Sequence, residues 1–283
     1  MAISISDSAR FISNQQDNNL VPEANPHRSH AMSRKIALIT GASRGLGRNA
    51  ALHLAEAGID IIGTYRSQAD EARIVADEIE QHGARVRMLP LDVADSAGFS
   101  DFAQRVESVL KEHFGRPQFD YLVNNAGIGI HAAFAETTEA QFDQLLNIHL
   151  KGPFFLTQKL LPLLADGGRI LNVSTGLTRF TLPGHAAYAA MKGAMEVLTR
   201  YQAKELGGRG IAVNILAPGA IETDFSGGLV RDNAEVNRQI AGNTALGRAG
   251  LPDDIGGAVV ALLTDNSRWI NGQRVEASGG MFL

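Results

Sequence analysis

The 283-residue sequence contains no cysteine, which excludes disulfide bonds and thiolate metal sites. We therefore expect a reducing compartment and predict a cytoplasmic protein. The formal net charge is −4, and there is no basic block of five or more residues, so nucleic acid is not an expected partner. No apolar stretch approaches the roughly 20 residues that span a bilayer, so no membrane partner is expected either. The eight histidines lack metal-ligand spacing, which predicts no catalytic metal.

Residues 1–33 lack the periodicity of a helix or a strand and are rich in Ser, Asn and Asp. We predict a polar N-terminal extension there, either flexible or an arm packed on a neighbouring subunit. Hydrophobic residues make up 45% of the chain, which is enough for one sizeable core. Residues 34–283 are therefore predicted to form a single catalytic domain.

Apolar runs alternate with helical patterns along this domain, which is typical of βαβ units. The predicted strands are Ile36–Thr40, Asp60–Thr64, Arg85–Leu89, Tyr121–Asn124, Ile170–Ser174, Ala212–Ala217 and Arg274–Ala277. The predicted helices are Leu46–Ala57, Ala69–His82, Gly98–His113, Glu139–Leu164, His185–Leu206 and Asp253–Leu263. The pattern predicts an α/β fold: a single doubly wound parallel sheet of Rossmann type with helices on both faces. The glycine-rich, polar stretch around 225–250 is predicted to be a mobile lid, with an ordinary surface helix and loop as the alternative.

A glycine-rich loop follows the first predicted strand, and we call residues 40–47 the glycine loop. Its glycines permit a tight turn and a close approach of the backbone to a diphosphate. The helix that follows presents free N–H groups to the anion. The loop therefore predicts a dinucleotide site that includes Gly41, Ser43, Arg44, Gly45, Leu46 and Gly47.

The end of the second predicted strand indicates which dinucleotide is bound. An NAD site places an acid there to accept hydrogen bonds from the ribose hydroxyls, but Gly63–Ser67 contains none. Asp60 is acidic but lies at the opposite end of the strand. Arg44 and Arg66 could instead clamp a 2′-phosphate as forked cations. NADP(H) is therefore favoured over NAD(H); two solvated arginines are the alternative.

Tyr188 and Lys192 stand four residues apart in a predicted helix and so share one face. A free phenol, with a pKa near 10, is a poor acid–base group at neutral pH. We expect a neighbouring ammonium, and the positive ring of an oxidised nicotinamide, to lower the pKa of Tyr188. Tyr188 could then donate a proton to a carbonyl oxygen or accept one from an alcohol.

The ordered set of motifs resembles the short-chain dehydrogenase/reductase family, and most closely its 3-oxoacyl-carrier-protein reductases. The resemblance covers the chain from about Arg34 to Leu283. It rests on the glycine loop, Asp92, Asn124–Gly127, Tyr188 with Lys192, and Pro218–Thr223.

This resemblance implies further cofactor contacts. Asp92, with Val93 beside it, would face the adenine, although a turn aspartate is the alternative reading. The implied contacts with the nicotinamide ribose and carboxamide are Asn125, Ala126, Gly127, Lys192, Pro218, Gly219, Ile221 and Thr223.

Two assignments in the catalytic group stay open. A hydroxyl should polarise the substrate carbonyl, and we favour Thr175 by its position, with Ser174 as a close second. The family's asparagine, which shapes a proton path from the lysine, is replaced here by His149. That histidine could serve the path through its backbone carbonyl or a ring nitrogen. The alternative is a satisfied interior histidine.

The sequence therefore predicts an NADP(H)-dependent reductase or dehydrogenase of a ketone–alcohol pair, with a small carbonyl or alcohol substrate. The resemblance implies a homotetramer, with a homodimer as the alternative. Two other functions remain open: an NAD-linked alcohol dehydrogenase, and a catalytically weak cofactor-binding regulatory protein. The motifs do not choose among acyl thioesters, sugars, steroids, quinones and small ketones.

Overall fold

The computed structural model describes residues 34–283. The predicted N-terminal extension lies outside the described residues. The strands are β1 Ile36–Ile39, β2 Asp60–Tyr65, β3 Val86–Pro90, β4 Phe119–Asn124, β5 Leu164–Val173, β6 Ala212–Pro218 and β7 Arg274–Ala277. The helices are α1 Gly45–Glu56, α2 Ala69–Gln81, α3 Phe99–Val109, α4 Glu139–Leu146, α5 Gly152–Leu160, α6 Ala186–Leu206, α7 Leu229–Asp232, α8 Ala234–Gly242 and α9 Pro252–Leu263.

The described residues contain a parallel sheet of seven strands in the order β3-β2-β1-β4-β5-β6-β7. Leu38 in β1 pairs with Ile62 in β2 on one side and with Leu122 in β4 on the other. The strand order therefore reverses direction between β1 and β4. In doubly wound sheets, ligands bind outside the carboxyl ends of the strands at such a switch point.

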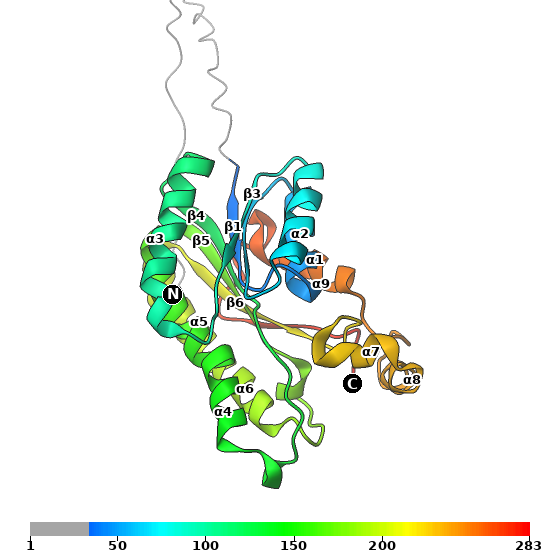
Figure 1. The fold of residues 1–283 in the computed structure, drawn as a ribbon. Coiled ribbons are helices and arrows are strands. Elements are labelled where there is room, and N and C mark those ends of the chain that lie inside the picture. Colours follow the sequence, from blue (N-terminus) through cyan, green and yellow to red (C-terminus); the bar gives the residue numbers. More distant parts are fainter. Residues whose placement is uncertain (1–33) are drawn as a thin grey trace, which may run out of the picture. The chain divides into compact units, whose positions relative to one another are not determined.

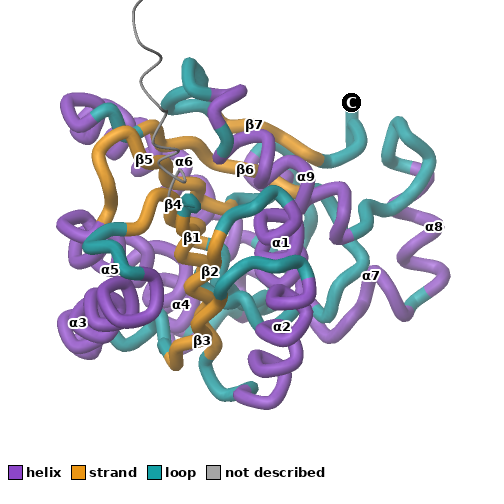
Figure 2. The backbone as a smooth tube through the Cα atoms, turned by 90° about the horizontal axis from the view of Figure 1, so that it is seen from above, coloured by secondary structure: helices purple, strands orange, loops and turns teal. Residues whose placement is uncertain are grey.

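Helices cover both faces of the sheet, with α1, α2 and α9 on one face and α3, α5 and α6 on the other (Figures 1 and 2). Alternate strand residues supply the two cores, because successive side chains of a strand point to opposite faces. In β1, Ala37 and Ile39 belong to the core under α1, while Ile36 and Leu38 belong to the core under α3. The predicted fold class is confirmed. None of the described helices is long and apolar enough to cross a membrane.

The predicted single helix Glu139–Leu164 is wrong. The chain forms α4, then a π-helical turn over Asn147–Lys151, and then α5. Pro153 lacks the N–H that would otherwise bond the carbonyl four residues earlier, so regular α-helical bonding cannot continue through this point. Single π turns occur frequently at functional sites. Leu164, the last residue of the predicted helix, instead begins β5.

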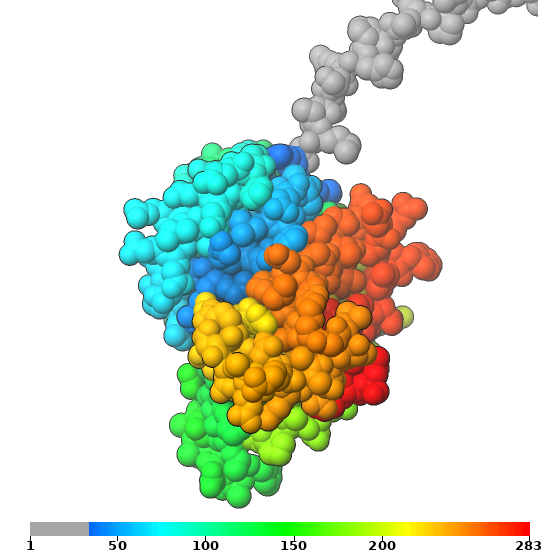
Figure 3. All heavy atoms as spheres, turned by 90° about the vertical axis from the view of Figure 1, so that its right-hand side faces the viewer, coloured from blue at the N-terminus to red at the C-terminus, as the bar shows by residue number. Residues whose placement is uncertain are grey.

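The stretch predicted as a lid contains the short helices α7 and α8. Its end is joined to the C-terminus: Thr244 bridges Met281, and the Phe282 N–H donates to the Asn243 carbonyl at 2.8 Å. Figure 3 shows this yellow-to-orange segment beside the red C-terminal residues. Residues 243–246 are therefore tied to the C-terminal residues, and α7 and α8 precede this contact.

Candidate active site

The predicted site residues gather at one edge of the sheet. The glycine loop follows β1, Arg66 follows β2, and Asp92 follows β3. Asn125 follows β4, and the remaining predicted residues follow β5 and β6 or lie on α4–α6. Because all strands are parallel, their carboxyl ends meet along this edge. The predicted site residues therefore lie together at the carboxyl ends of the strands.

The glycine loop has the shape of a cradle. A Cβ atom at Gly47 would lie only 2.0 Å from the Gly41 carbonyl oxygen, so no side chain fits there. The Asn125 amide donates to the carbonyls of Thr40 and Gly41, at 3.0 and 3.2 Å. Beside Gly45, by contrast, the space is open, with the Thr223 Cβ 4.0 Å from a built Cβ.

The first turn of α1 contains no acidic residue, and no described side chain caps its N-terminus. Free backbone N–H groups and the positive end of the helix dipole therefore face the open space. This arrangement fits the diphosphate of a dinucleotide.

The two arginines expected to distinguish NADP(H) from NAD(H) are exposed to solvent. Arg44 and Arg66 are exposed, and neither forms an ion pair within residues 34–283. Asp60 is fully buried and accepts from the Arg85 guanidinium at 2.6 Å, at the opposite end of β2. Asp92 is exposed and accepts from the Ala94 N–H at 2.9 Å, which is a turn contact. That contact leaves its second carboxylate oxygen available to a ligand.

The ends of β4 and β6 close the cofactor side of the site. A side-chain hydrogen bond ties β4 to β5 here, since the Asn124 amide donates to the Asn172 side chain at 2.8 Å. After β6, Ile221 bridges Gly250, and the Thr223 hydroxyl accepts from the Phe225 N–H at 3.2 Å. A Cβ at Gly219 would lie 2.8 Å from the Ser278 Cα, so this position also requires glycine.

Tyr188 and Lys192 are both buried, on the same face of α6. The Lys192 ammonium donates to the Val173 carbonyl at 2.7 Å and lies 5.7 Å from the centroid of the Tyr188 ring. Burial lowers the pKa of Lys192 to about 8. Lys192 is therefore still mostly charged at neutral pH.

The expected lowering of the Tyr188 pKa is not what these surroundings produce. Burial raises the pKa of Tyr188, and the hydrogen bond with Thr175 offsets only part of that rise. The Lys192 ammonium donates to a backbone carbonyl and not to the phenol oxygen, which explains why Lys192 does not lower the pKa of Tyr188. Tyr188 is accordingly a protonated phenol at neutral pH, the form that can donate to a carbonyl oxygen.

The two candidate hydroxyls point to different partners. Ser174 is buried and donates to Glu196 at 2.7 Å. Thr175 is hydrogen-bonded to Tyr188, and its Oγ1 also accepts from the Leu177 N–H at 3.3 Å. Of the two hydroxyls, only that of Thr175 lies beside the phenol.

His149 lies in the π-helical turn, 2% exposed, with its ring edge-on to Tyr188 at 5.1 Å between centroids. Its Nε2 is within hydrogen-bonding distance of both the N–H and the carbonyl of Ile128. Nδ1 has no hydrogen-bond partner among residues 34–283. Burial and the charge of Lys192 lower the pKa of His149 to about 3, so the ring is neutral. Gly127 is needed here, because a Cβ would approach the His149 ring to 2.7 Å.

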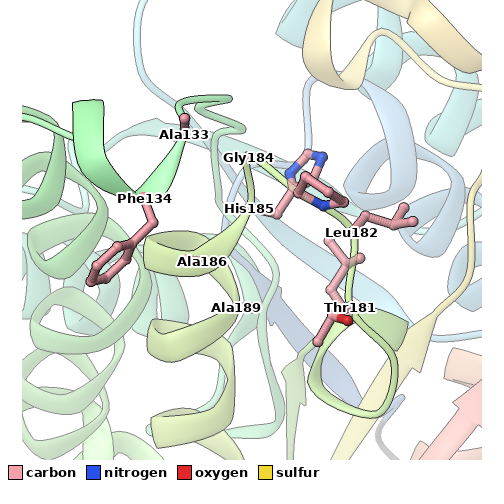
Figure 4. Close-up of a pocket in the computed structure, with 10 residues that line it drawn as sticks. Ala133, Phe134, Thr181, Leu182, Gly184, His185, Ala186 and Ala189 are labelled. Atoms are coloured by element: carbon pink, nitrogen blue, oxygen red, sulfur yellow. The ribbon is translucent and has the colours of Figure 1, made fainter.

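A cavity of about 290 Å³ opens beside the start of α6. Figure 4 shows Phe134 on one side of that helix, and Thr181 and Leu182 on the other. Its lining is mostly apolar: Ala133, Phe134, Leu177, Thr181, Leu182, Pro183, Gly184, His185, Ala186 and Ala189. Leu177 also packs in the apolar cluster around Tyr188, so the cavity adjoins the catalytic group.

Three residues near the site were missed by the sequence reasoning. The Phe225 ring lies 6.1 Å from that of Tyr188, and Glu196 and Arg274 contact the turn after β5. Glu196 stands four residues after Lys192 on the same helix, a spacing that could have indicated it. Arg274 comes from β7, and no local pattern connects it to this turn.

Comparison with known proteins shows that the chain is similar to reductases. A family model described as enoyl-(acyl carrier protein) reductase matches residues 41–282. The tetrahydroxynaphthalene reductase PfmaG of Pestalotiopsis fici is 36% identical over 271 residues, which cover 92% of this chain and 95% of PfmaG. The 3-oxoacyl-(acyl-carrier-protein) reductase FabG of Staphylococcus aureus is 36% identical over 254 residues, 88% of this chain and 98% of FabG.

Among solved structures, the landomycin C-6 ketoreductase LanV with bound NADP and rabelomycin is similar, with a TM-score of 0.80 at 35% identity. The match covers 88% of this chain and 96% of LanV. The fold and these matches define an oxidoreductase built on a Rossmann-type sheet. The chain belongs to the short-chain dehydrogenase/reductase family.

Proposed function

We propose that the protein reduces a ketone to a secondary alcohol with NADPH, and that Tyr188 acts as the general acid. The observation that carries this proposal is the buried pair Tyr188 and Lys192, with the half-buried Thr175, beside the open cradle of the glycine loop. The surroundings keep Tyr188 protonated, which favours reduction over oxidation at neutral pH. The buried pair and the intact cradle also favour an enzyme over a regulatory protein that only binds the cofactor.

NADPH, when bound, supplies the hydride. The glycine loop and the N-terminus of α1 hold its diphosphate, and Arg44 and Arg66 take the 2′-phosphate. Asp92, Asn125 and the stretch Pro218–Thr223 line the remainder of the dinucleotide. Thr175 donates a hydrogen bond to the substrate carbonyl oxygen, Tyr188 delivers the proton, and Lys192 keeps the neighbouring potential positive. Phe225 and α7 form the lid.

We further propose that the substrate is a ketone on a fused aromatic ring system. The apolar cavity beside Tyr188 supports it, since Phe134, Leu177 and Leu182 offer no charge to a polar substrate. The names of two relatives point the same way, because one acts on a tetrahydroxynaphthalene and the other holds rabelomycin. A panel of 1-tetralone, an acetoacetyl thioester and cyclohexanone, followed by loss of NADPH absorbance, tests this. Faster turnover of the thioester than of the tetralone would contradict the substrate class.

We also propose a cytoplasmic homotetramer, with a homodimer as the alternative. Phe154 and Phe155 on α5 and Tyr201 on α6 are exposed, which supports self-association through these helices. Light scattering after size-exclusion chromatography gives the mass of the assembly, and a monomer would contradict the proposal.

NADPH should bind more tightly than NADH, and Arg44 and Arg66 should carry the difference. A hydrogen bond to a charged group contributes about 1.5–3 kcal/mol. Each of Arg44→Ala and Arg66→Ala should therefore weaken NADPH binding by about 10- to 100-fold and leave NADH binding almost unchanged. Fluorescence titration with both cofactors measures this.

Arg268→Ala provides the matched control for these two variants. It removes an exposed arginine that precedes β7. Arg268 therefore lies at the amino ends of the parallel strands, away from the glycine loop. Equal losses of NADH and NADPH affinity in the two test variants would contradict the assignment of the 2′-phosphate site.

A further inference from the structure

One carboxylate oxygen beneath the turn after β5 receives three hydrogen bonds. Glu196 Oε1, on α6, accepts from the Ser174 hydroxyl at 2.7 Å, from the Thr178 hydroxyl at 2.6 Å and from the Arg274 Nε at 2.8 Å. The Glu196 side chain is only 15% exposed and the Arg274 side chain 23%. This convergence joins α6, β7 and both ends of the turn at one atom.

The contacts continue along a chain of alternating charges. Arg274 also pairs with Glu276 at 2.8 Å, and Glu276 pairs with Arg179 at 2.6 Å. Arg179, which follows the same turn, donates to the carbonyls of Met281 and Phe282. Hydrogen bonds from the Arg179 guanidinium, then from the Ser278 hydroxyl and the Arg274 guanidinium, lower the pKa of Glu276 to about 2, so Glu276 is charged at neutral pH. The C-terminal residues are thereby tied to the turn that carries Thr175.

The network determines which hydroxyl can face the substrate. Ser174 has one hydroxyl proton, and its bond to Glu196 uses it. The Thr175 carbonyl is held by Arg274 at 3.3 Å and lies 3.0 Å from the Thr178 hydroxyl. The Oγ1 atom of Thr175 accepts from the Leu177 N–H, so the proton of the Thr175 hydroxyl stays available for another acceptor. The backbone on both sides of Thr175 is therefore anchored, while its hydroxyl is directed to Tyr188.

We propose that Glu196 is a positioning residue: it holds Ser174 and Thr178 so that Thr175, and not Ser174, presents its hydroxyl to the substrate carbonyl. The proposal rests on the function proposed above, because it gives Glu196 a role only through Thr175. Glu196 contacts neither Tyr188 nor the open cradle and therefore takes no part in proton transfer. Arg274 completes the support by fixing the orientation of the carboxylate.

The test compares two substitutions of Glu196. Glu196→Ala removes the acceptor, and a misplaced hydroxyl should lower kcat by about 10- to 100-fold. Glu196→Gln keeps an oxygen for all three donors and should retain activity within about threefold of wild type, since only the charge facing Arg274 is lost. NADPH affinity by fluorescence and the midpoint of thermal unfolding are measured for both variants. Neither should change enough to account for a tenfold loss of kcat.

A double-mutant cycle with Thr175→Val shows whether Glu196 acts through Thr175. Residues that act as one unit are not additive, so Glu196→Ala should add less than about threefold to the loss caused by Thr175→Val. Full additivity would overturn the proposal, as would wild-type turnover in Glu196→Ala. Equal impairment of the Gln and Ala variants would overturn it too. If Glu196→Ala does not fold, Thr178→Val takes its place in the same cycle with the same expected non-additivity.

The outcomes separate this inference from the proposed function. Wild-type turnover in Thr175→Val would remove the hydroxyl mechanism and the inference with it. If Thr175→Val is impaired and Glu196→Ala is fully active, only the role proposed for Glu196 is contradicted, and the proposed function stands.

Discussion

Replacing Tyr188 by phenylalanine is expected to lower turnover by at least about 100-fold, the usual effect of losing a general acid. The substitution deletes one oxygen from a buried ring and leaves the ring's packing against His149 in place. Cofactor affinity should therefore remain nearly unchanged. Steady-state turnover with the best ketone of the panel, together with NADPH titration, measures the two quantities separately.

Tyr201→Phe is the matched control for that experiment. Tyr201 lies on the same helix but is 64% exposed, so the loss of its hydroxyl should leave turnover unchanged. Activity of Tyr188→Phe within a fewfold of wild type would show that another group delivers the proton. A parallel loss in NADPH affinity would instead indicate that Tyr188 acts mainly in cofactor binding.

The protonation state of Tyr188 also predicts which direction of the reaction is faster near neutral pH. Its pKa lies above the ordinary value for tyrosine, so the phenol stays protonated across the neutral range. Reduction needs that proton, whereas oxidation of an alcohol needs the phenolate. Reduction should accordingly be the faster direction near neutral pH. The ammonium of Lys192 is lost as the pH rises through about 8, which weakens the positive potential beside the phenol.

The fold could be predicted from the sequence because its strands are buried on both faces. Runs such as Ile36–Ile39 are continuously apolar, and their alternation with helical patterns specifies a doubly wound sheet. The break in the helix Glu139–Leu164 was missed because its sequence stays compatible with a helix up to Pro153. The sequence left a surface helix and loop open around 225–250 but did not predict the bounds of α7 and α8, because glycine and polar residues dominate that stretch and no residue of α8 is buried.

The candidate site could be predicted only as far as local motifs reach. The glycine loop, Tyr188 and Lys192 lie in short patterns whose spacing carries the chemistry. The direction of the Tyr188 pKa could not be read from spacing, because it depends on how deeply the surrounding elements bury the phenol. Glu196 and Arg274 meet across 78 residues of sequence, and that contact exists only once α6 and β7 are packed together.

The choice between Ser174 and Thr175 yields the other large expected effect. Thr175→Val keeps the shape of the side chain but removes its hydroxyl, and turnover should fall by about 100-fold or more with little change in cofactor affinity. Ser174→Ala should lower turnover far less, because the Ser174 hydroxyl already donates to Glu196 and does not reach Tyr188. Position supports the same choice, since Thr175 stands 13 residues before Tyr188, the commoner separation in the family that the sequence resembles.

The Thr175→Val variant needs a control, because Thr175 Oγ1 also caps the turn over Gly176–Thr178. Loss of a side-chain cap costs about 0.5–2 kcal/mol of stability, which could displace the turn without any chemical role for the hydroxyl. Thr175→Ser separates the two effects, since serine restores both the cap and the donor while removing the methyl group that restricts the rotamer. Turnover of Thr175→Ser should be close to that of wild type. Impairment of Ser174→Ala alone would reverse the assignment, and full activity in all three variants would mean that no hydroxyl at this strand end polarises the carbonyl.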